Sequence, residues 1–343
     1  MTKTPPWATS QLPHSYLPFV VCAILALAAS KCLAQTGPPP IRVDVNVVNV
    51  PVTVSNARGE FVGGLRQENF RLRVDGEPRP IDYFAAEEEP AQVLVLVETG
   101  PAVYLLRDEH FFAAAALLNG LASADRVAVA SYEQSPRLLA DFSPDKQVAA
   151  AALNSLIFGL GTAQLNFYDS LAQCIDWLGQ ASGKRAIVAL TTGLDSSGPA
   201  AWQALAQKLQ RSNVMVLPVE LGGELRKPPA RKVRSSERTG SRPVVDVSAE
   251  FAEFDRALAG IAEETGGRVY VPESQAEFES AYRQIASLLR HEYSLGFNSR
   301  AQDGRYHNIE VEVVDTRGEP LNKNQKKPDF RWNSRRGFLA QSP

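Results

Sequence analysis

Residues 98–102 (Glu-Thr-Gly-Pro-Ala) are the part of this sequence whose residue types and position could carry chemistry. A single carboxylate follows Gln92 and the apolar run 93–97 (VLVLV), and a Gly-Pro turn follows the carboxylate. A continuous Val/Leu run of this length, ended by turn residues, indicates a buried central strand of an α/β sheet. Because ligands in such sheets gather at the carboxyl ends of strands, Glu98 stands where a binding site is expected.

Cys174 could act as a nucleophile with His110, His291 or His307 as its base. Cys174 shares an apolar helical face with residues 171, 175 and 178, which predicts a buried, inert thiol instead. His307 falls on an alternating strand and is predicted to be structural or exposed. The sequence contains no serine nucleophile elbow, phosphate loop, paired metal histidines or Cys-x-x-Cys motif. These observations predict a protein that is not an enzyme.

The elements that position Glu98 alternate between strands and helices. Strands are expected at 92–98, 125–132, 137–142, 184–190, 214–221 and 267–271, and the strand at 137–142 is expected to pair antiparallel with 125–132. Helices are expected at 102–121, 145–156, 168–180, 200–211, 254–265 and 275–290. Such alternation favours right-handed βαβ units, and therefore a doubly wound, mostly parallel α/β sheet with Rossmann-like layering.

Two short β segments flank this α/β unit. Residues 41–54, 70–74 and 81–84 alternate apolar and polar before it, and residues 292–297, 306–314 and 329–332 do so after it. Each segment alone would bury too little apolar surface to be stable. We therefore expect the N-terminal segment 41–90 and the C-terminal segment 292–340 to pair into one β-sandwich, with the α/β domain 91–291 inserted between them.

The N-terminal residues 1–34 resemble a secretion signal. Lys3 precedes the apolar stretch 17–29, and small residues suit cleavage after Ala34. We expect a secreted or periplasmic protein with no stable membrane span after cleavage; an uncleaved N-terminal anchor is the alternative. Only Cys174 would remain of three cysteines, which excludes an intrachain disulfide.

The charge balance and one unusual segment bear on partners. Loss of residues 1–34 would leave 34 basic and 38 acidic residues, a net charge of −4. This balance gives no basic footprint for nucleic acid. Residues 222–246 hold seven basic residues and three prolines and are expected to form a disordered loop. A solvated insertion and a docking arm for an acidic partner are both open for this loop.

Several motifs in order resemble one family. The segments 92–98, 184–193 (KRAIVALTTG, followed by Asp195) and 214–220 resemble core strands of von Willebrand factor A domains. The flanking segments resemble the exported bacterial VWFA-related proteins that are abundant in acidobacteria. The flanking residues that carry this resemblance are Val52-Thr53-Val54, Gly64-Leu65, Glu68-Asn69-Phe70, Val74-Asp75-Gly76, residues 304–311 (GRYHNIEV) and Arg336-Gly337-Phe338.

The resemblance implies a divalent-cation site at the sheet edge, and this chain departs from its pattern. In the family the first strand ends in Asp-x-Ser-x-Ser, and a loop Thr and a further Asp complete the oxygen ligands for Mg²⁺ or Mn²⁺. The corresponding residues here are Glu98, Gly100, Ala102, Leu165 and Thr192. The expected reading is a degenerate site with no metal and no other cofactor; Mg²⁺ or Mn²⁺ binding is the minor alternative.

The resulting functional hypothesis is an exported, non-enzymatic module that binds an unknown protein partner without metal, as in adhesion or scaffolding. The residues expected at the partner surface are Glu98, Thr99, Pro101, Tyr104, Phe167, Thr192 and Asp195. One alternative is an envelope structural protein in which the α/β domain is a spacer. The other is a hydrolase with an unrecognised site.

Overall fold

A computed structural model provides the coordinates of this chain. It describes residues 46–86, 90–101, 103, 107–159, 164–179, 181, 183–223, 248–321 and 330–341. The predicted signal peptide 1–34, the residues Ala102 and Tyr104, and nearly all of the predicted basic loop 222–246 lie outside these residues.

The central sheet has five strands in the order β7-β6-β5-β8-β9. They are β5 (Ala91–Glu98), β6 (Arg126–Tyr132), β7 (Pro136–Ser143), β8 (Lys184–Thr191) and β9 (Val214–Glu220). β5 pairs in parallel with β6 and β8, and β8 pairs in parallel with β9. Only β7 runs antiparallel in this sheet, against β6, as the sequence predicted. The carboxyl ends of four strands therefore share one edge, which we call the carboxyl edge.

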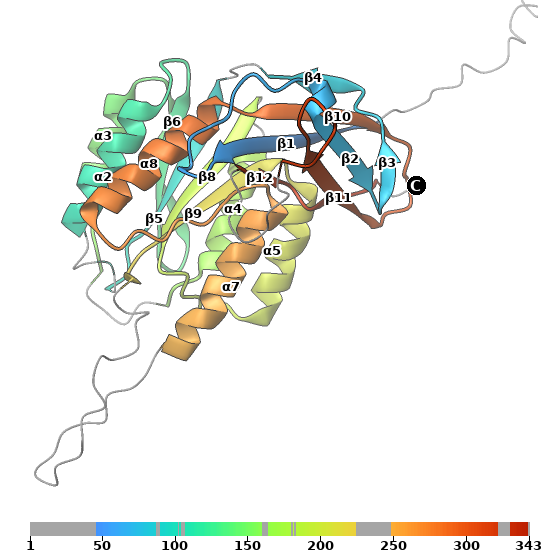
Figure 1. Cartoon of the computed structure of the whole chain (residues 1–343). Helices are drawn as coiled ribbons and strands as arrows, with labels where there is room; N and C mark the ends of the chain where they lie inside the picture. The colour runs from blue at the N-terminus through green and yellow to red at the C-terminus, as the bar shows by residue number, and fades with distance from the viewer. Residues whose placement is uncertain are drawn as a thin grey trace, which may run out of the picture. The chain divides into compact units, whose positions relative to one another are not determined.

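Helices cover both faces of this sheet, as Figure 1 shows. They are α2 (Arg107–Gly120), α3 (Lys146–Asn154), α4 (Phe167–Gly179), α5 (Pro199–Arg211), α7 (Ser248–Glu264) and α8 (Gln275–Arg290). The odd residues of β5, such as Val95, join a core with α2, α3 and α8, and the even residues, such as Leu96, join a second core with α4, α5 and α7. Because both faces are covered, β5 needs apolar residues at successive positions.

The flanking segments form the predicted β-sandwich. One sheet has the order β12-β1-β10-β4, and the other has the order β13-β11-β2-β3. The N-terminal strands are β1 (Asn46–Asn56), β2 (Phe70–Val74), β3 (Glu77–Arg79) and β4 (Tyr83–Ala85); the C-terminal strands are β10 (Tyr293–Ser299), β11 (Tyr306–Val313), β12 (Phe330–Ser334) and β13 (Gly337–Leu339). N- and C-terminal strands pair directly, for example β1 with β10 and β11 with β2, around a shared core. Both the α/β class and this pairing are confirmed.

One predicted strand is much shorter in the structure. Of residues 267–271, only Tyr270 pairs with the sheet, through a single parallel bridge to Val219. The chain is still turning before this point, because Gly266 has φ +75°, and Pro272 has no N–H to continue pairing. Gly267 is also fixed by packing, since a Cβ there would lie 1.9 Å from the carbonyl oxygen of Val216.

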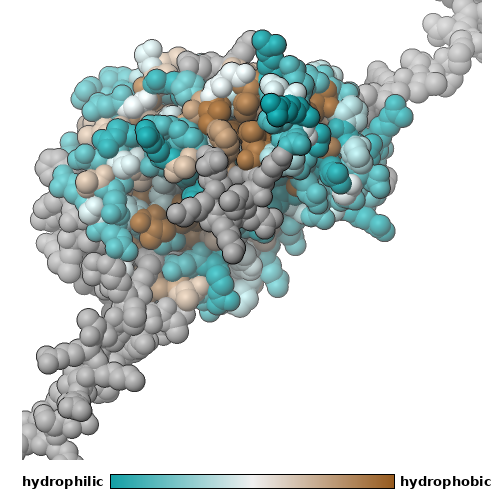
Figure 2. Space-filling view, in the orientation of Figure 1, coloured by the Kyte–Doolittle hydropathy of each residue, from teal (hydrophilic) through white to brown (hydrophobic). Residues whose placement is uncertain are grey.

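The surface is hydrophilic over most of the face in Figure 2, with hydrophobic surface gathered near the place where α8 passes into β10 in Figure 1. Phe61 stacks on His291 and Tyr293 near this junction. No helix among the described residues is long and apolar enough to cross a membrane.

Candidate functional site

Glu98, the last residue of β5, is fully buried at the carboxyl edge. Its carboxylate turns toward the end of the neighbouring strand β8. Oε2 accepts a hydrogen bond from the backbone N–H of Thr192 (2.7 Å), and the Thr192 hydroxyl lies 3.0 Å from Oε1 and 2.9 Å from Oε2. One residue therefore donates to the carboxylate through both its backbone and its side chain.

Two further hydroxyls complete a cage around this carboxylate. Tyr132, the last residue of β6, places its hydroxyl 3.0 Å from Glu98 Oε2, and Thr191, the last residue of β8, places its hydroxyl 3.2 Å from the same atom. The two hydroxyls are also 2.6 Å apart. We call Glu98, Tyr132, Thr191 and Thr192 the hydroxyl cage. Its donors come from the ends of β6 and β8, the two strands on either side of β5, because parallel strands finish at one edge.

The electrostatics of the cage follow from its burial. Burial raises the pKa of Glu98, and the hydrogen bonds from Thr192, Tyr132 and Thr191 oppose that rise. Burial and the nearby Glu98 also raise the pKa of Tyr132 well above its usual value. Tyr132 therefore remains a neutral hydroxyl at physiological pH and serves as a hydrogen-bonding group.

An apolar contact closes the edge beside the cage. Leu165 is 6% exposed, and a Cβ added at Gly100 would lie 2.8 Å from its Cδ2 atom. Leu165 is held in place from the loop after β8: its N–H donates to Ser196 Oγ (3.3 Å), and its carbonyl accepts from the N–H of Ser196 (2.6 Å). The two positions at which the family pattern places a Ser and a Thr thus pack against each other.

Asp195 is occupied by the protein itself. Its Oδ1 accepts from the N–H of Tyr168 in the first turn of α4 (3.0 Å), and its Oδ2 accepts from the N–H groups of Ser197 (2.8 Å) and Gly198 (3.1 Å). The Ser197 hydroxyl donates to the same carboxylate. A carboxylate at a helix N-terminus stabilises the otherwise unpaired N–H groups and the helix dipole. Asp195 therefore supports the fold of this edge.

These donors do not fit a divalent cation. The acceptor atoms of Glu98 face protein donors, and the cage is enclosed by packing. Leu165 presents methyl groups where a hard cation requires oxygen. Within the described ranges, no group of three or more His, Cys, Asp or Glu side chains is arranged to hold a metal ion.

The residues expected at a partner surface divide into buried and exposed ones. Glu98, Phe167 and Thr192 are fully buried, and Thr99 is 4% exposed, so their side chains do not reach the surface. This burial differs from the expectation for these four residues. The physical reason is that Glu98 and Thr192 form hydrogen bonds within the cage, and Phe167 packs in the core between α4 and the sheet.

Pro101 is exposed, and Asp195 is partly exposed although its carboxylate is bonded to Tyr168, Ser197 and Gly198. Tyr104 lies outside the described residues. The partner surface predicted from the sequence is thus reduced to its loop residues.

Sequence reasoning missed Tyr132 and Thr191 as members of the cage. A signal was present, since each is a hydroxyl residue at the end of a strand adjacent to β5. The buried thiol predicted for Cys174 is confirmed: the side chain is fully buried, and burial raises its pKa to about 12.

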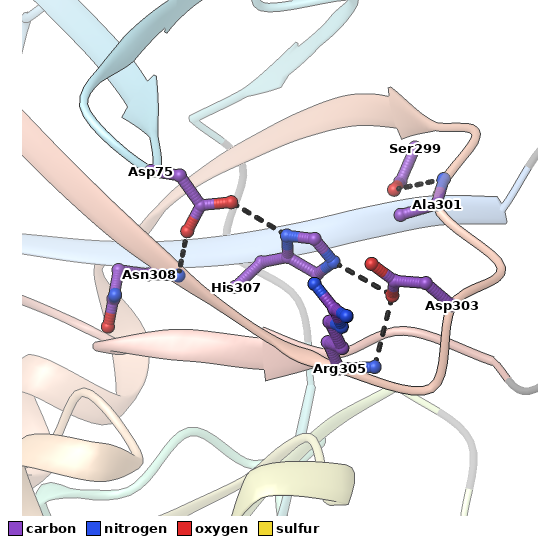
Figure 3. Close-up of polar contacts among 7 residues, drawn as sticks. All are labelled: Asp75, Ser299, Ala301, Asp303, Arg305, His307 and Asn308. Atoms are coloured by element: carbon purple, nitrogen blue, oxygen red, sulfur yellow. Dashed lines mark hydrogen bonds and ion pairs between the residues drawn. The ribbon is translucent and has the colours of Figure 1, made fainter.

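A second polar constellation surrounds His307 in the sandwich (Figure 3). His307 Nδ1 lies 2.7 Å from Asp75 Oδ2, and Nε2 lies 3.1 Å from Asp303 Oδ1. The ring also stacks on Phe338. Asp75 belongs to the two-residue turn between β2 and β3, where it and Gly76 both have positive φ, as Asp-Gly hairpin turns require. The arrangement ties this turn to β11 and to the loop before it.

The pKa shifts in this constellation favour the charged pairs. The hydrogen bond that His307 donates to Asp75 raises the pKa of His307 and lowers the pKa of Asp75. An imidazolium can donate from both ring nitrogens at once, which neutral imidazole cannot. His307 is thus a structural cross-link, in agreement with the prediction that it is structural or exposed.

Comparisons with known proteins give only remote likenesses. No protein-family profile and no curated protein matches the chain. Among solved structures, a von Willebrand factor type A protein from Catenulispora acidiphila has a TM-score of 0.43 at 12% identity and covers 80% of this chain and 72% of its own. An aerotolerance-related membrane protein from Bacteroides fragilis has a TM-score of 0.42 at 15% identity, over 58% of this chain and 98% of its own.

The SpRpn10 VWA domain has a TM-score of 0.40 at 12% identity, over 57% of this chain and 94% of its own. Because these TM-scores lie below 0.5, the fold assignment stands on the strand order and helix placement of this chain. The likenesses say nothing about its substrate, partner or metal.

Proposed function

We propose that this chain is an exported, non-enzymatic module that binds a protein partner at the carboxyl edge of its central sheet, without a bridging metal. The observation that carries the metal-free part is the hydroxyl cage. Glu98 Oε2 is 2.7 Å from the Thr192 N–H and 3.0 Å from the Tyr132 hydroxyl, so protein donors stand where a cation would be needed. A cation would have to break these bonds and displace Leu165 before it reached the carboxylate.

The support for a partner at this edge is the way the edge presents apolar residues. Gly159 N–H donates to the carbonyl of Thr99 (2.9 Å), which holds the segment 156–159 against the end of β5. Leu156 and Phe158 pack partly into the core, while Ile157 between them is 77% exposed. An exposed apolar side chain on an anchored loop is suited to insertion into a partner's pocket.

The non-enzymatic part of the proposal rests on the chemistry of the described groups at this edge. The Glu98 carboxylate is fully buried and does not reach the surface. The Asp195 carboxylate accepts hydrogen bonds from Tyr168, Ser197 and Gly198. Cys174, the thiol that could act as a nucleophile, is buried, and its raised pKa disfavours the thiolate. Export is proposed from the signal-like residues 1–34.

The proposal is tested by site-specific photocrosslinking in the envelope and culture supernatant of the source cells. A photoreactive residue at Ile157 is expected to capture a discrete protein. The matched control is Tyr83, which is 53% exposed on β4 of the sandwich and is expected to capture nothing specific. The captured partner is then purified and titrated against the chain with and without EDTA.

Unchanged affinity in EDTA is the expected result. Crosslinks from Tyr83 but not from Ile157 would place the contact on the sandwich and overturn the proposed surface. A complex that dissociates in EDTA and re-forms with Mg²⁺ would overturn the metal-free part.

A further inference from the structure

A cavity of about 300 Å³ lies at the end of the sheet opposite the carboxyl edge. The start of β8 and the loop before β9 form one wall, and β1 and β10 of the sandwich form the other. It is separated from the hydroxyl cage by the length of β8, which begins at Lys184 and ends at Thr191. Nothing in the proposed partner surface uses this cavity.

Arg335 lines the cavity as a buried charge whose printed hydrogen bonds all go to neutral acceptors. It is 6% exposed and follows β12. Its guanidinium donates to the carbonyls of Gly337 (2.6 Å) and Gln210 (3.2 Å) and to Asn213 Oδ1 (2.7 Å). All three acceptors are neutral, and two of the five guanidinium N–H groups remain unused by these bonds. Burial lowers the pKa of Arg335, and the nearby Tyr306 and Glu264 only oppose that shift.

A second guanidinium in the lining, that of Arg185, also has an N–H group without an acceptor. Arg185 also lines the cavity, its Nη1 donates to the carbonyl of Gly179 (3.2 Å), and its Nε is buried without a hydrogen-bond partner. The acidic residue in the lining, Glu292, is already paired with Lys184 (2.9 Å). Among the described lining residues, three cations thus face one carboxylate, and the two arginines account for the excess.

Two asparagines in the lining also present donors. Asn49 Oδ1 accepts from the hydroxyl of Ser294 (2.7 Å), and Asn213 Oδ1 accepts from Arg335 (2.7 Å). Because each amide oxygen accepts one of these bonds, the NH₂ group of each side chain is the part that can donate to a ligand. The lining therefore combines more cations than carboxylates with amide donors.

We propose that this cavity binds a small molecule that carries an oxyanion group, a phosphate or a carboxylate. Bidentate guanidinium contacts are suited to both groups, and the volume lies at the lower end of that of small-molecule pockets. The anion would satisfy unused N–H groups of Arg335 and Arg185 and neutralise the excess charge. Its position between β8 and β1 would also link ligand binding to the contact between the α/β domain and the sandwich.

The test uses the full chain, with inorganic phosphate and succinate as separate probes at constant ionic strength set with sodium chloride. Isothermal titration and thermal unfolding are both recorded. A saturable heat and a saturable rise in Tm are expected for one probe or both, and chloride alone should give neither. Saturation by phosphate only would assign a phosphate-bearing ligand, and saturation by succinate only would assign a carboxylate-bearing one.

Variants locate the binding. Arg185→Gln is expected to weaken the apparent affinity about ten-fold or more, since it removes a charge-assisted donor. Arg137→Gln, which removes the same charge from the exposed side of β7, should leave the affinity unchanged. Asn49 is exposed, so Asn49→Asp should leave the chain folded. The new carboxylate in the lining would repel an anion, so this variant should also weaken binding. Failure of both probes to saturate, or equal affinity in wild type, Arg185→Gln and Asn49→Asp, would overturn the proposal.

Discussion

Replacing Glu98 with alanine tests whether the hydroxyl cage stabilises the carboxyl edge through internal hydrogen bonds. The substitution removes the acceptor for the Thr192 N–H (2.7 Å), the Thr192 hydroxyl (2.9 Å) and the Tyr132 hydroxyl (3.0 Å). Tyr132 can turn fully to Thr191, because their hydroxyls are already 2.6 Å apart. The backbone N–H of Thr192 cannot turn away and would lose its 2.7 Å acceptor in a buried site.

The expected loss follows from these contacts. An unpaired buried donor costs about 1–3 kcal/mol, and the space vacated by a long side chain adds a comparable cavity cost. We therefore expect Glu98→Ala to lower the free energy of unfolding by about 3–5 kcal/mol. Glu98→Gln keeps the shape and one acceptor oxygen, so its expected loss is about 1–2 kcal/mol.

Urea-induced unfolding at neutral pH, followed by circular dichroism, measures these differences. Glu77→Ala on the exposed strand β3 is the control, with an expected change within about 0.5 kcal/mol. The order Ala, then Gln, then the control would support the cage. A Glu98→Ala variant as stable as the control would refute this reasoning, because it would mean that the carboxylate contributes nothing to the edge.

Three further predictions concern cations, pH and packing. Adding Mg²⁺ or EDTA should leave the Tm of the wild type within about 1 °C, as thermal unfolding would show, because a cation that does not bind the native state cannot stabilise it. Folding raises the pKa of His307, so its contribution to stability is complete below the pKa of the unfolded state and is lost as the pH rises through the pKa of the folded state. The difference in free energy of unfolding between wild type and His307→Gln should therefore be larger at about pH 5.5 than at about pH 8.5. An equal difference at both pH values would contradict the cross-link. Gly267→Ala should lower the free energy of unfolding in urea by about 3 kcal/mol or more, because its Cβ would lie 1.9 Å from the Val216 carbonyl oxygen. The control is Gly179→Ala, whose Cβ meets nothing within 4 Å and which should leave the free energy of unfolding almost unchanged.

The local pattern of the sequence was sufficient for most of the fold. Apolar residues at successive positions in 93–97 indicated a strand covered on both faces, and alternation in 70–74 indicated a strand covered on one. The prediction that two short β segments pair across the inserted domain also followed from the sequence, because neither segment could bury enough apolar surface alone. The strand at 267–271 was predicted too long, because the chain is still turning at Gly266 and Pro272 has no N–H to continue the pairing beyond Tyr270.

The sequence by itself placed Glu98 at the end of the central strand, and its resemblance to von Willebrand factor A domains predicted that the cation ligands of those domains are replaced here. It could not determine where the Glu98 carboxylate goes. That depends on the register of β6 and β8 beside β5, which brings Tyr132 and Thr191 to the same edge. The extra methylene of glutamate allows the carboxylate to reach those hydroxyls and the Thr192 N–H.

Tertiary packing likewise decided which residues remain at the surface. Phe167 has the residue type of a partner contact, yet it is fully buried against Tyr132. Ile157 has the residue type of a core residue, yet it is exposed because its two neighbours point into the core instead. Side-chain type sets what a residue can do, and the burial that only the folded chain creates sets whether it does so inside the protein or against a partner.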